Sequence, residues 1–442
     1  MCGIIGYNGF QDPKGILLDG LKRLEYRGYD SAGVAVYENG TVALFRSIGR
    51  IQELEKKLAD KQFSGAIGIG HTRWATHGAP TEMNAHPHRV GNITIVHNGI
   101  IENYLEHKEA LLEMGRQISS DTDSEILAHL FDLSTRAGKC LSEAVTNVIP
   151  RLKGSYAFVM MSDKEPDTLV GVCNGAPLLV GIGQNEIFLA SDVQAILHWT
   201  NKIVYLKDHQ FIVCKKNAVE LQDTTGKRLE PEVKIIQWTA DQVEKEGYRH
   251  YMLKEICEQP QAIANTIESN IDLGRGIVNL QELYEFTDEL RKINHISIVA
   301  CGTARHAGLV GEYYLERFAR IPVDVDFGSE FRYRDPILKD GTLTILISQS
   351  GETADTLAGL REAKVKAIPT LSICNVREST LTRDSDIVLY TNAGPEIGVA
   401  STKAFTTQLT VLYMLAIHLG VAKGTLKEDE ARRLTGELLK LP

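Results

Sequence analysis

The hydrophobic positions in the first half of the chain form short runs typical of β-strands, separated by glycine-rich turns. Between these runs, residues 16–24 and 124–133 place apolar side chains at the i, i+3, i+4 spacing of amphipathic helices. This pattern predicts mixed sheets with helices packed on them. The strand-like runs include residues 33–37, 93–96, 156–161 and 203–206.

From His295 onward the pattern changes to a repeated order of strand, turn and helix. Apolar runs rich in β-branched residues alternate with helical patterns, which predicts a parallel, doubly wound sheet. We therefore assign the chain to the α/β class, with an α+β N-terminal part. The predicted strands of the second half are residues 296–300, 342–347, 370–374 and 386–390.

A domain boundary is expected near residues 227–247, which are dense in charge and lack a regular apolar period. The following stretch, 248–290, has a helical pattern. A length of 442 residues fits two or three domains. We expect a first domain over residues 2–225, a linker with connecting helices over 226–282, and a second domain over 283–442.

Composition and charge favour a folded cytoplasmic enzyme. Hydrophobic residues make up 43% and charged residues 24%, as in ordinary globular proteins. The net charge of -9 gives no general attraction to nucleic acid or to an anionic membrane. Seven widely spaced cysteines without a C-x-x-C pair are typical of a reducing compartment. The N-terminus lacks a secretory-signal pattern, and the longest apolar stretch, 409–422, is too short to span a bilayer.

The N-terminal sequence Met1-Cys2-Gly3-Ile4-Ile5-Gly6 carries the strongest indication of chemistry. Removal of the initiator methionine, which a small second residue permits, leaves a thiol and a free α-amine on Cys2. The ordinary pKa of an α-amine is about 7.7 to 8.0 and that of a thiol about 8.5, so the amine can accept the thiol proton. Nucleophile and base then belong to one residue, which suits acyl transfer. The alternative is that a cysteine at the second position is incidental.

Polar groups gather along the predicted strands at residues 71–78, 84–88 and 97–99. The side-chain amide of Asn98 and the backbone N–H of Gly99 are the two donors that a developing oxyanion requires. The alternative is an Asn-Gly hairpin turn, the commonest use of that dipeptide.

An amino-acid substrate requires a cation for its carboxylate and an anion for its ammonium group. Arg73 can form a bidentate pair with a carboxylate, and Asp123 can pair with an ammonium group. Alternatively, Asp121 or Asp123 caps the helix that begins near Ser124.

Five histidines lie between positions 71 and 97, and the spacing His86-x-His88 suggests a metal site on one strand face. No carboxylate or cysteine stands at ligand spacing beside them. We therefore expect structural or hydrogen-bonding histidines and no metal.

A second polar cluster, Ser348-Gln349-Ser350-Gly351-Glu352-Thr353, follows the predicted strand 342–347 and opens a helical run over 354–363. Hydroxyls and free backbone N–H groups at a helix N-terminus predict a phosphate site; the alternative is an ordinary N-cap with a capping-box glutamate. Cys301-Gly302-Thr303 ends the first strand of this half at the same carboxyl edge, where parallel sheets bind ligands. Two such loops favour a sugar phosphate, and without a Walker lysine or a G-x-G-x-x-G fingerprint we infer no nucleotide.

Four segments of the first half together resemble the N-terminal-nucleophile glutaminase domain of the glutamine:fructose-6-phosphate aminotransferase (isomerising) family. The resemblance implies a four-layer αββα domain in which Cys2 attacks the side-chain amide of glutamine and Asn98 and Gly99 form the oxyanion hole. The segments are residues 1–6, 25–33, 71–78 and 97–103.

The same resemblance implies roles around the substrate. Arg73 and Asp123 hold the α-groups of glutamine, with Thr76 and His77 helping on the carboxylate side. Trp74 is similar to the family's gate on the channel that carries ammonia to the second domain; its alternative is a packed core or rim aromatic.

Residues 301–304, 348–353 and 398–408 look like the first sugar-isomerase (SIS) subdomain of this family. The resemblance implies that hydroxyl-bearing and polar side chains bind the phosphate and hydroxyls of fructose 6-phosphate, with two further residues lining the pocket. The binding residues are Thr303, Ser348, Gln349, Ser350 and Thr353, and the lining residues are Val399 and Ser401. Ala304 stands where the family commonly has serine, which puts one hydroxyl contact in doubt.

The combined interpretation is a glutamine-dependent amidotransferase that makes glucosamine 6-phosphate from glutamine and fructose 6-phosphate. The chain ends at Pro442, before the family's second SIS subdomain and C-terminal tail, so we expect a partial sequence with the glutaminase half-reaction rather than complete synthesis. The family is commonly dimeric, and we expect a homodimer that requires no cofactor.

Two alternatives remain open. Another Cys2 amidotransferase, such as one acting on phosphoribosyl pyrophosphate or an asparagine synthetase, requires a paired-acid pyrophosphate loop or an ATP-pyrophosphatase loop, and neither is evident in the second half. A sugar-phosphate-binding SIS protein is the non-catalytic alternative, but it leaves the Cys2 motifs unexplained.

Overall fold

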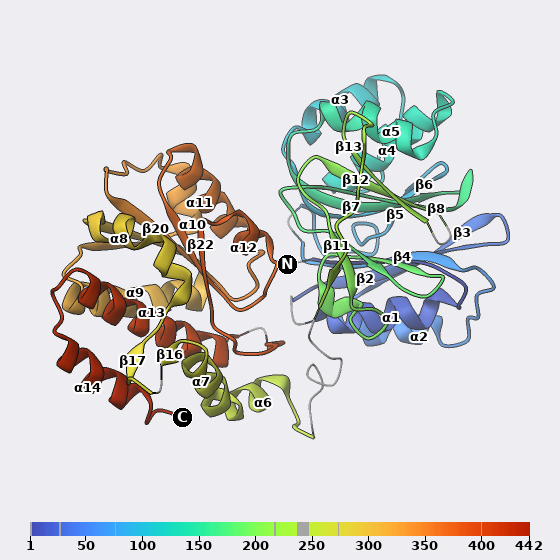
Figure 1. Ribbon diagram of the computed structural model, residues 1–442. Coiled ribbons are helices and arrows are strands. Elements are labelled where there is room, and N and C mark those ends of the chain that lie inside the picture. The colour runs from blue at the N-terminus through green and yellow to red at the C-terminus, as the bar shows by residue number, and fades with distance from the viewer. Residues whose placement is uncertain are drawn as a thin grey trace. The chain divides into compact units, whose positions relative to one another are not determined.

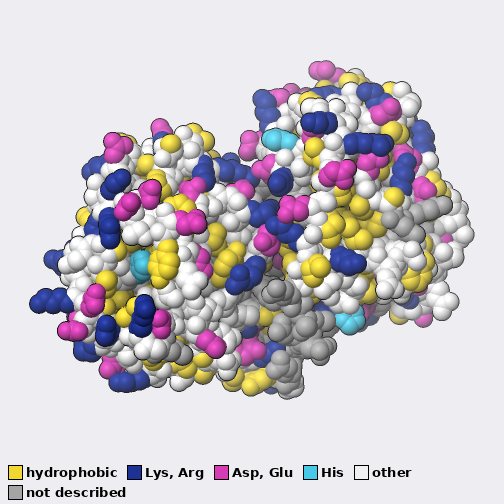
Figure 2. All heavy atoms as spheres, in the orientation of Figure 1, with side chains coloured by type: hydrophobic (Ala, Val, Ile, Leu, Met, Phe, Trp, Pro, Cys, Tyr) yellow, Lys and Arg dark blue, Asp and Glu magenta, His cyan; other side chains and the backbone are white. Residues whose placement is uncertain are grey.

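The structure is a computed structural model that describes residues 2–25, 28–75, 77–215, 218–236, 247–272, 274–398 and 400–442. The chain divides into two compact units, Met1–Asp241 and Gln242–Pro442 (Figure 1). On the face drawn in Figure 2, basic and acidic side chains are interspersed over both units, in keeping with the modest net charge.

The first unit is built on two stacked sheets (Figure 1). The eight-stranded sheet has the order β15-β11-β9-β10-β1-β4-β2-β3, and the seven-stranded sheet has the order β14-β13-β12-β8-β7-β6-β5. The strands of the first sheet are β1 (Gly3–Asn8), β2 (Ser31–Glu38), β3 (Thr41–Ile48), β4 (Ile67–Arg73), β9 (Leu179–Ile182), β10 (Ile187–Ala190), β11 (Lys202–Tyr205) and β15 (Lys234–Ile235). Those of the second are β5 (His88–Val90), β6 (Ile93–Ile101), β7 (Gly154–Ser162), β8 (Glu165–Asn174), β12 (Gln210–Lys215), β13 (Ala218–Asp223) and β14 (Arg228–Leu229).

The strand pairs of both sheets are antiparallel within the described residues, so the prediction of mixed sheets was wrong. Short connections explain part of the difference, because a tight turn can join only antiparallel neighbours, as in the pairs β2–β3 and β7–β8. The strands β2 and β3, for example, are joined by the turn at Asn39 and Gly40. Other antiparallel pairs, such as β1 with β10, join strands far apart in the chain and depend on the fold as a whole.

Helices cover the outer faces of the two sheets, which confirms the four-layer αββα architecture (Figure 1). The helix α1 lies close to β4 because Gly68 and Gly70 leave room for Leu17 and Leu21. Apolar residues of both sheets, such as Ile4 and Val96, form the core between them. The helices are α1 (Pro13–Arg23) and α2 (Ile51–Leu58) on the first sheet, and α3 (Tyr104–Glu113), α4 (Asp123–Arg136) and α5 (Leu141–Val148) on the second, with 3-10 turns at Ile149–Arg151 and Val193–Ala195.

The second unit contains a five-stranded parallel sheet with the order β19-β18-β20-β21-β22. Apolar residues of β20 contribute to cores on both sides, Ile345 packing with α13 on one face and Leu346 with α11 on the other. The predicted doubly wound sheet is therefore confirmed. Its strands are β18 (His295–Ala300), β19 (Val323–Phe327), β20 (Thr342–Ser348), β21 (Thr370–Cys374) and β22 (Ile387–Tyr390), and β16 (Ile271–Asp272) pairs with β17 (Ile277–Val278) outside it.

The helix α13 crosses the core of this unit. It is long and apolar enough to qualify as a membrane span by length and composition, but 67% of the tested stretch is buried inside the unit, as expected of a core helix. The helices are α6 (Tyr251–Cys257), α7 (Gln259–Glu268), α8 (Thr287–Lys292), α9 (Gly302–Phe318), α10 (Gly328–Tyr333), α11 (Ala354–Val365), α12 (Thr380–Asp384), α13 (Lys403–Ala422) and α14 (Glu428–Leu438), with a 3-10 turn at Gln281–Phe286.

Candidate functional sites

The thiol of Cys2 lies just before the first residue of β1, a central strand of the eight-stranded sheet. Gly3 pairs with Thr72 of β4, which places Cys2 beside the chain that leaves this strand. The backbone N–H of Trp74 donates to Sγ of Cys2 at 3.2 Å, and Sγ lies 3.6 Å from the Trp74 carbonyl oxygen. An N–H directed at the sulfur stabilises negative charge on it, which favours a nucleophilic thiolate.

Asn98 lies next to this cysteine. Its Nδ2 donates to the Cys2 carbonyl oxygen at 3.3 Å, and its Oδ1 lies 2.9 Å from Nε2 of His71. Asn98 and Gly99 are part of β6 and pair with Ala157 and Tyr156, so the hairpin-turn alternative was wrong. The structure thus brings together Cys2 and the side-chain amide expected to act as an oxyanion donor.

Gly99 has a conformation that other residues rarely adopt, with φ at +113°. A Cβ atom at this position would lie 2.1 Å from the carbonyl oxygen of Ser155. Glycine is therefore required for both reasons, the backbone conformation and the close approach of β7.

Arg73 is almost fully buried, and its guanidinium binds the loop that follows β4. It donates to the carbonyl oxygens of Ala79 at 3.4 Å and Gly78 at 3.3 Å, and also to that of His77. The ring of His77 packs against Tyr104, with 5.1 Å between the ring centroids. Thr76 lies outside the described residues, so its predicted role has no geometry here.

Trp74 is 55% exposed, which excludes the core alternative. Its ring lies over Gly28, where an added Cβ would come within 2.6 Å of ring carbon Cζ3. The side chain is thus exposed, while the backbone N–H of the same residue contacts the Cys2 thiol.

Asp123 is the first residue of α4, and its carboxylate does not cap the helix. The N-cap is Thr122, whose hydroxyl accepts from the N–H of Glu125, so the prediction that Asp121 or Asp123 caps the helix was wrong. Oδ2 of Asp123 accepts from the backbone N–H of Ile101 at 2.9 Å. This contact places the carboxylate at the end of β6, the strand that contains Asn98.

Four of the five histidines in this region are buried and bonded to polar neighbours. His88 Nε2 lies 3.0 Å from Thr122 Oγ1, and His97 Nδ1 lies 2.8 Å from Ser124 Oγ. Burial lowers the pKa of His71 and of His88 to about 3 and also lowers the pKa of His86 and His97, so all four rings are neutral at neutral pH. Among the described residues, no group of three His, Cys, Asp or Glu side chains is placed to hold a metal ion.

The predicted phosphate residues of the second unit lie at the carboxyl edge of its parallel sheet. The strand order places the switch point of the sheet between β18 and β20, where doubly wound folds bind ligands. Thr303 stands in the first turn of α9, directly after β18, and is exposed. Ser348 is the last residue of β20, and the loop before α11 follows it. Two loops are thus brought to the same edge of the sheet.

Hydroxyl groups organise the loop after β20. Ser348 Oγ lies 3.1 Å from Thr353 Oγ1 and accepts from the N–H of Gly351 at 3.0 Å, and Ser350 Oγ accepts from the N–H of Glu352 at 3.2 Å. The capping-box alternative was wrong, because the N-cap Thr353 makes no side-chain cap and Glu352 accepts instead from the N–H of Thr380. Gln349 is partly buried, and its backbone carbonyl accepts from the next loop of the sheet edge, at Asn375 and Val376.

Two buried glutamates that the sequence analysis did not identify hold the loop before α13. Glu396 accepts from the Ser401 hydroxyl at 2.9 Å and from the Thr402 N–H at 2.8 Å, while Glu255 accepts from the N–H of Gly398 at 2.9 Å. Burial raises the pKa of Glu255. The available sequence signal was Glu396 inside the otherwise apolar stretch 393–400, whereas Glu255 stands among other charged residues and gave no signal. Val399, in the same loop, lies outside the described residues.

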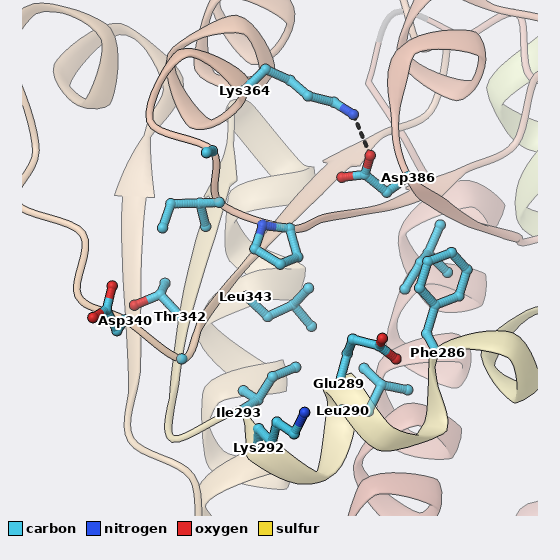
Figure 3. A pocket seen from close by; sticks show the side chains of 15 residues that line it. Phe286, Glu289, Leu290, Lys292, Ile293, Asp340, Thr342, Leu343, Lys364 and Asp386 are labelled. Atoms are coloured by element: carbon cyan, nitrogen blue, oxygen red, sulfur yellow. Dashed lines mark hydrogen bonds and ion pairs between the residues drawn. The ribbon is translucent and has the colours of Figure 1, made fainter.

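A cavity of about 620 Å³ lies at the opposite, amino edge of the same sheet (Figure 3). It is lined by Thr342 and Leu343 at the start of β20 and by Ile387 at the start of β22, and an ion pair between Lys364 and Asp386 stands beside it. None of the predicted site residues lines it. The cavity is therefore distinct from the predicted phosphate loops.

Comparisons with known proteins agree with the two units. Residues 71–198 match the glutamine amidotransferase domain and residues 289–418 match the SIS domain. A solved C-terminal domain of glucosamine-fructose-6-phosphate aminotransferase from Francisella tularensis is 46% identical, covering 44% of this chain and 55% of that chain, with a TM-score of 0.43.

Curated relatives match the whole chain. The glutamine–fructose-6-phosphate aminotransferase (isomerizing) of Clostridium tetani is 50% identical over 444 residues, which cover 100% of this chain and 72% of the relative. That of Thermus thermophilus is 46% identical with the same coverage.

The αββα unit with a cysteine at its first strand, followed by a SIS unit, defines the chain as a glutamine amidotransferase with an attached sugar-isomerase domain. Its identity to full-length relatives is more specific. The chain belongs to the glutamine–fructose-6-phosphate aminotransferase (isomerizing) family.

Proposed function

We propose that this chain hydrolyses glutamine at Cys2 and that its SIS unit binds fructose 6-phosphate, the acceptor of the released ammonia in the synthesis of glucosamine 6-phosphate. The observation that carries the proposal is the group around the thiol. The Trp74 N–H is directed at Sγ, and the Asn98 amide lies 3.3 Å from the carbonyl oxygen of the same cysteine. Family membership supports the choice of both substrates.

The proposed reaction starts with transfer of the thiol proton to the α-amine of Cys2, once Met1 has been removed. The thiolate attacks the side-chain amide carbon of glutamine, and the amide oxygen becomes an oxyanion that accepts hydrogen bonds from Asn98 Nδ2 and the Gly99 N–H. As the carbon–nitrogen bond breaks, the ammonium group of Cys2 returns its proton to the departing nitrogen, and ammonia leaves. Water then attacks the thioester, and glutamate and the free thiol are released.

Substrate recognition rests on opposite charges. Arg73, with help from Thr76 and His77, binds the α-carboxylate of glutamine, and Asp123 binds its ammonium group. The guanidinium carries five N–H donors, and its bonds to three loop carbonyls leave further donors for a ligand. Trp74 is proposed as the gate for ammonia that leaves the thiol, since its ring is exposed and its backbone N–H contacts the thiol.

The proposed sugar-phosphate site uses the two loops at the carboxyl edge of the parallel sheet. Backbone N–H groups and hydroxyls at the starts of α9 and α11 bind the phosphate and sugar hydroxyls, and the loop held by Glu396 lines the pocket. Its residues are Thr303, Ser348, Gln349, Ser350, Thr353, Val399 and Ser401. Ala304 offers no hydroxyl at its position.

We also propose a cytoplasmic homodimer. The structure records no disulfide among the described cysteines, which supports a reducing compartment. The second unit carries strongly exposed apolar side chains, among them Tyr313, Tyr333 and Ile337, which support an interface between subunits.

The test is glutamate release from glutamine by the wild-type chain and by Cys2→Ala, with and without fructose 6-phosphate. Mass spectrometry of the intact protein checks that Met1 is absent. We expect Cys2→Ala to abolish glutamate release, while Cys140→Ala, which removes an exposed free cysteine of the same unit, leaves it unchanged. Equal activity of wild type and Cys2→Ala would overturn the proposed glutaminase.

A further inference from the structure

Asn98 has to present an N–H, and not its oxygen, to an oxyanion. A carboxamide is nearly symmetric in shape, so its orientation is decided by its partners. On one side of the amide lies the carbonyl oxygen of Cys2, which only accepts hydrogen bonds. On the other side lies Nε2 of His71, which donates or accepts according to its tautomer.

The partners of His71 settle this tautomer. A flipped amide would place two oxygens, Asn98 Oδ1 and the Cys2 carbonyl oxygen, about 3.3 Å apart with no hydrogen between them. The observed arrangement requires a hydrogen on Nε2 of His71, donated to Asn98 Oδ1 at 2.9 Å. Since the buried ring is neutral, its Nδ1 is then the unprotonated nitrogen.

His86 packs over the face of this ring. Its Nδ1 lies 2.9 Å from Nδ1 of His71 and 3.1 Å from Nε2, and an atom almost equidistant from both ring nitrogens stands above the ring and not in its plane. The two ring centroids are 4.0 Å apart, with an interplanar angle of 64°. His86 therefore holds the His71 ring in place by packing, and the contact with Asn98 assigns the tautomer.

We propose that His71, in the tautomer protonated at Nε2, orients the Asn98 amide, so that its second N–H is free for the oxyanion. The bond from His71 Nε2 to Asn98 Oδ1 carries this orientation, and the packing of His86 supports the His71 ring. Both histidines are positioning residues, because His71 acts through Asn98 and His86 acts through His71. The inference rests on the proposed function, in which Asn98 stabilises the oxyanion.

Burial keeps His71 in this state. His71 is completely buried in β4, and burial lowers the pKa of both rings, so protonation does not disturb the tautomer of His71 near neutral pH. A positive charge on either ring would also be opposed by the nearby guanidinium of Arg73.

The test compares substitutions at His71 in the full chain by steady-state glutamine hydrolysis. His71→Leu removes the donor to Asn98, and we expect kcat to fall at least about tenfold, part of the about 10²- to 10³-fold that loss of an oxyanion donor costs elsewhere. KM for glutamine and the rate of Cys2 alkylation by iodoacetamide stay within about twofold, because neither depends on the oxyanion. His71→Gln, whose Nε2 is also a donor, restores part of kcat.

His107→Leu is the matched control, since His107 is a buried histidine of the same unit whose hydrogen bonds go to Asn103 and Arg151 and not to Asn98.

A double-mutant cycle separates this inference from the proposed function. If His71 acts through Asn98, His71→Leu has no further effect on kcat in an Asn98→Ala background. Equal loss of kcat in both backgrounds, or a fall in kcat and alkylation rate together, would overturn the positioning role. Full kcat in Asn98→Ala alone would instead overturn the proposed oxyanion hole and leave Cys2 chemistry to be judged by Cys2→Ala.

Discussion

The carboxylate of Asp123 accepts a hydrogen bond from the backbone N–H of Ile101, with 2.9 Å between Oδ2 and the nitrogen. This bond joins the first residue of α4 to the last residue of β6, the strand that carries Asn98 and Gly99. The proposed anion for the glutamine ammonium group and the proposed oxyanion donors are thus positioned by one strand.

Asp123→Asn should weaken glutamine binding. The amide keeps an acceptor for Ile101 but loses the charge that pairs with an ammonium group, and charge-assisted hydrogen bonds contribute about 1.5 to 3 kcal/mol. We expect KM for glutamine to rise at least about tenfold, measured by glutamate release. Asp121→Asn is the control, because the Asp121 carboxylate accepts from the Asn84 side-chain amide at 3.1 Å and has no proposed contact with glutamine. Equal effects of the two substitutions would contradict the assignment.

Gly99→Ala should strongly destabilise the first unit. The positive φ contributes about 1 to 2 kcal/mol, and the clash with Ser155 adds to it, so we expect a loss of at least about 3 kcal/mol in the free energy of unfolding. Gly40→Ala has a similar φ of +85° with nothing within 4 Å of the added Cβ, and should lose only about 1 to 2 kcal/mol. Urea unfolding measures both, and similar losses would exclude the close approach of β7 as the cause.

Ser350→Ala should weaken the binding of fructose 6-phosphate. The hydroxyl shapes the loop through the Glu352 N–H and is proposed to contact the phosphate. Loss of a hydrogen bond to a charged group predicts a rise in Kd of about tenfold or more by calorimetry. Ser385→Ala removes a hydroxyl that donates to the Leu381 carbonyl in the same unit and should leave Kd unchanged. An unchanged Kd in Ser350→Ala would remove this residue from the proposed site.

Glu125→Gln should change how stability depends on pH. Burial alone would raise the pKa of Glu125, but His129 and the Ser119 and Ser120 N–H groups outweigh it and lower the pKa to about 2. Because the folded-state pKa lies below the unfolded one, the stabilising contribution is present above the ordinary value of about 4.5 and is lost as pH falls toward 2.

The expected difference in unfolding free energy between wild type and Glu125→Gln is therefore about 2 to 3 kcal/mol at neutral pH and shrinks as the pH approaches about 3. Urea unfolding at a series of pH values measures it. A difference that does not vary with pH would show that the ionised carboxylate does not carry the effect.

Local patterns were sufficient to predict most elements near the sites. The strands β18, β20 and β21 are mainly apolar runs because nearly all of their residues are buried, and such runs are recognisable in a sequence. The edge strand β22 is also apolar, although its residues alternate between buried and partly exposed. The edge strand β19 was missed: its sequence Val-Asp-Val-Asp-Phe alternates apolar and acidic residues over only five positions. The alternation was the available signal, but it is short and partly exposed.

The site could be predicted only as far as residue chemistry allows. Cys2, Asn98 and Asp123 are visible because their functional groups suit the reaction. The orientation of Asn98 by His71 depends on a contact between two residues that are 27 positions apart in the sequence and lie in different strands. No local pattern encodes such a contact. The caps were misjudged for a similar reason, since Thr122 and Asp123 are both good caps and only the contact with Ile101 decides between them.

The position of Cys2 at the start of β1 has a consequence for how the site opens. This strand lies inside its sheet, with β4 on one side and β10 on the other. The backbone amides of such a central strand are expected to exchange with solvent deuterium more slowly than those of a surface loop such as 349–352. The proposed nucleophile is therefore attached to a strand that resists local opening, whereas most of the proposed phosphate ligands lie on a loop.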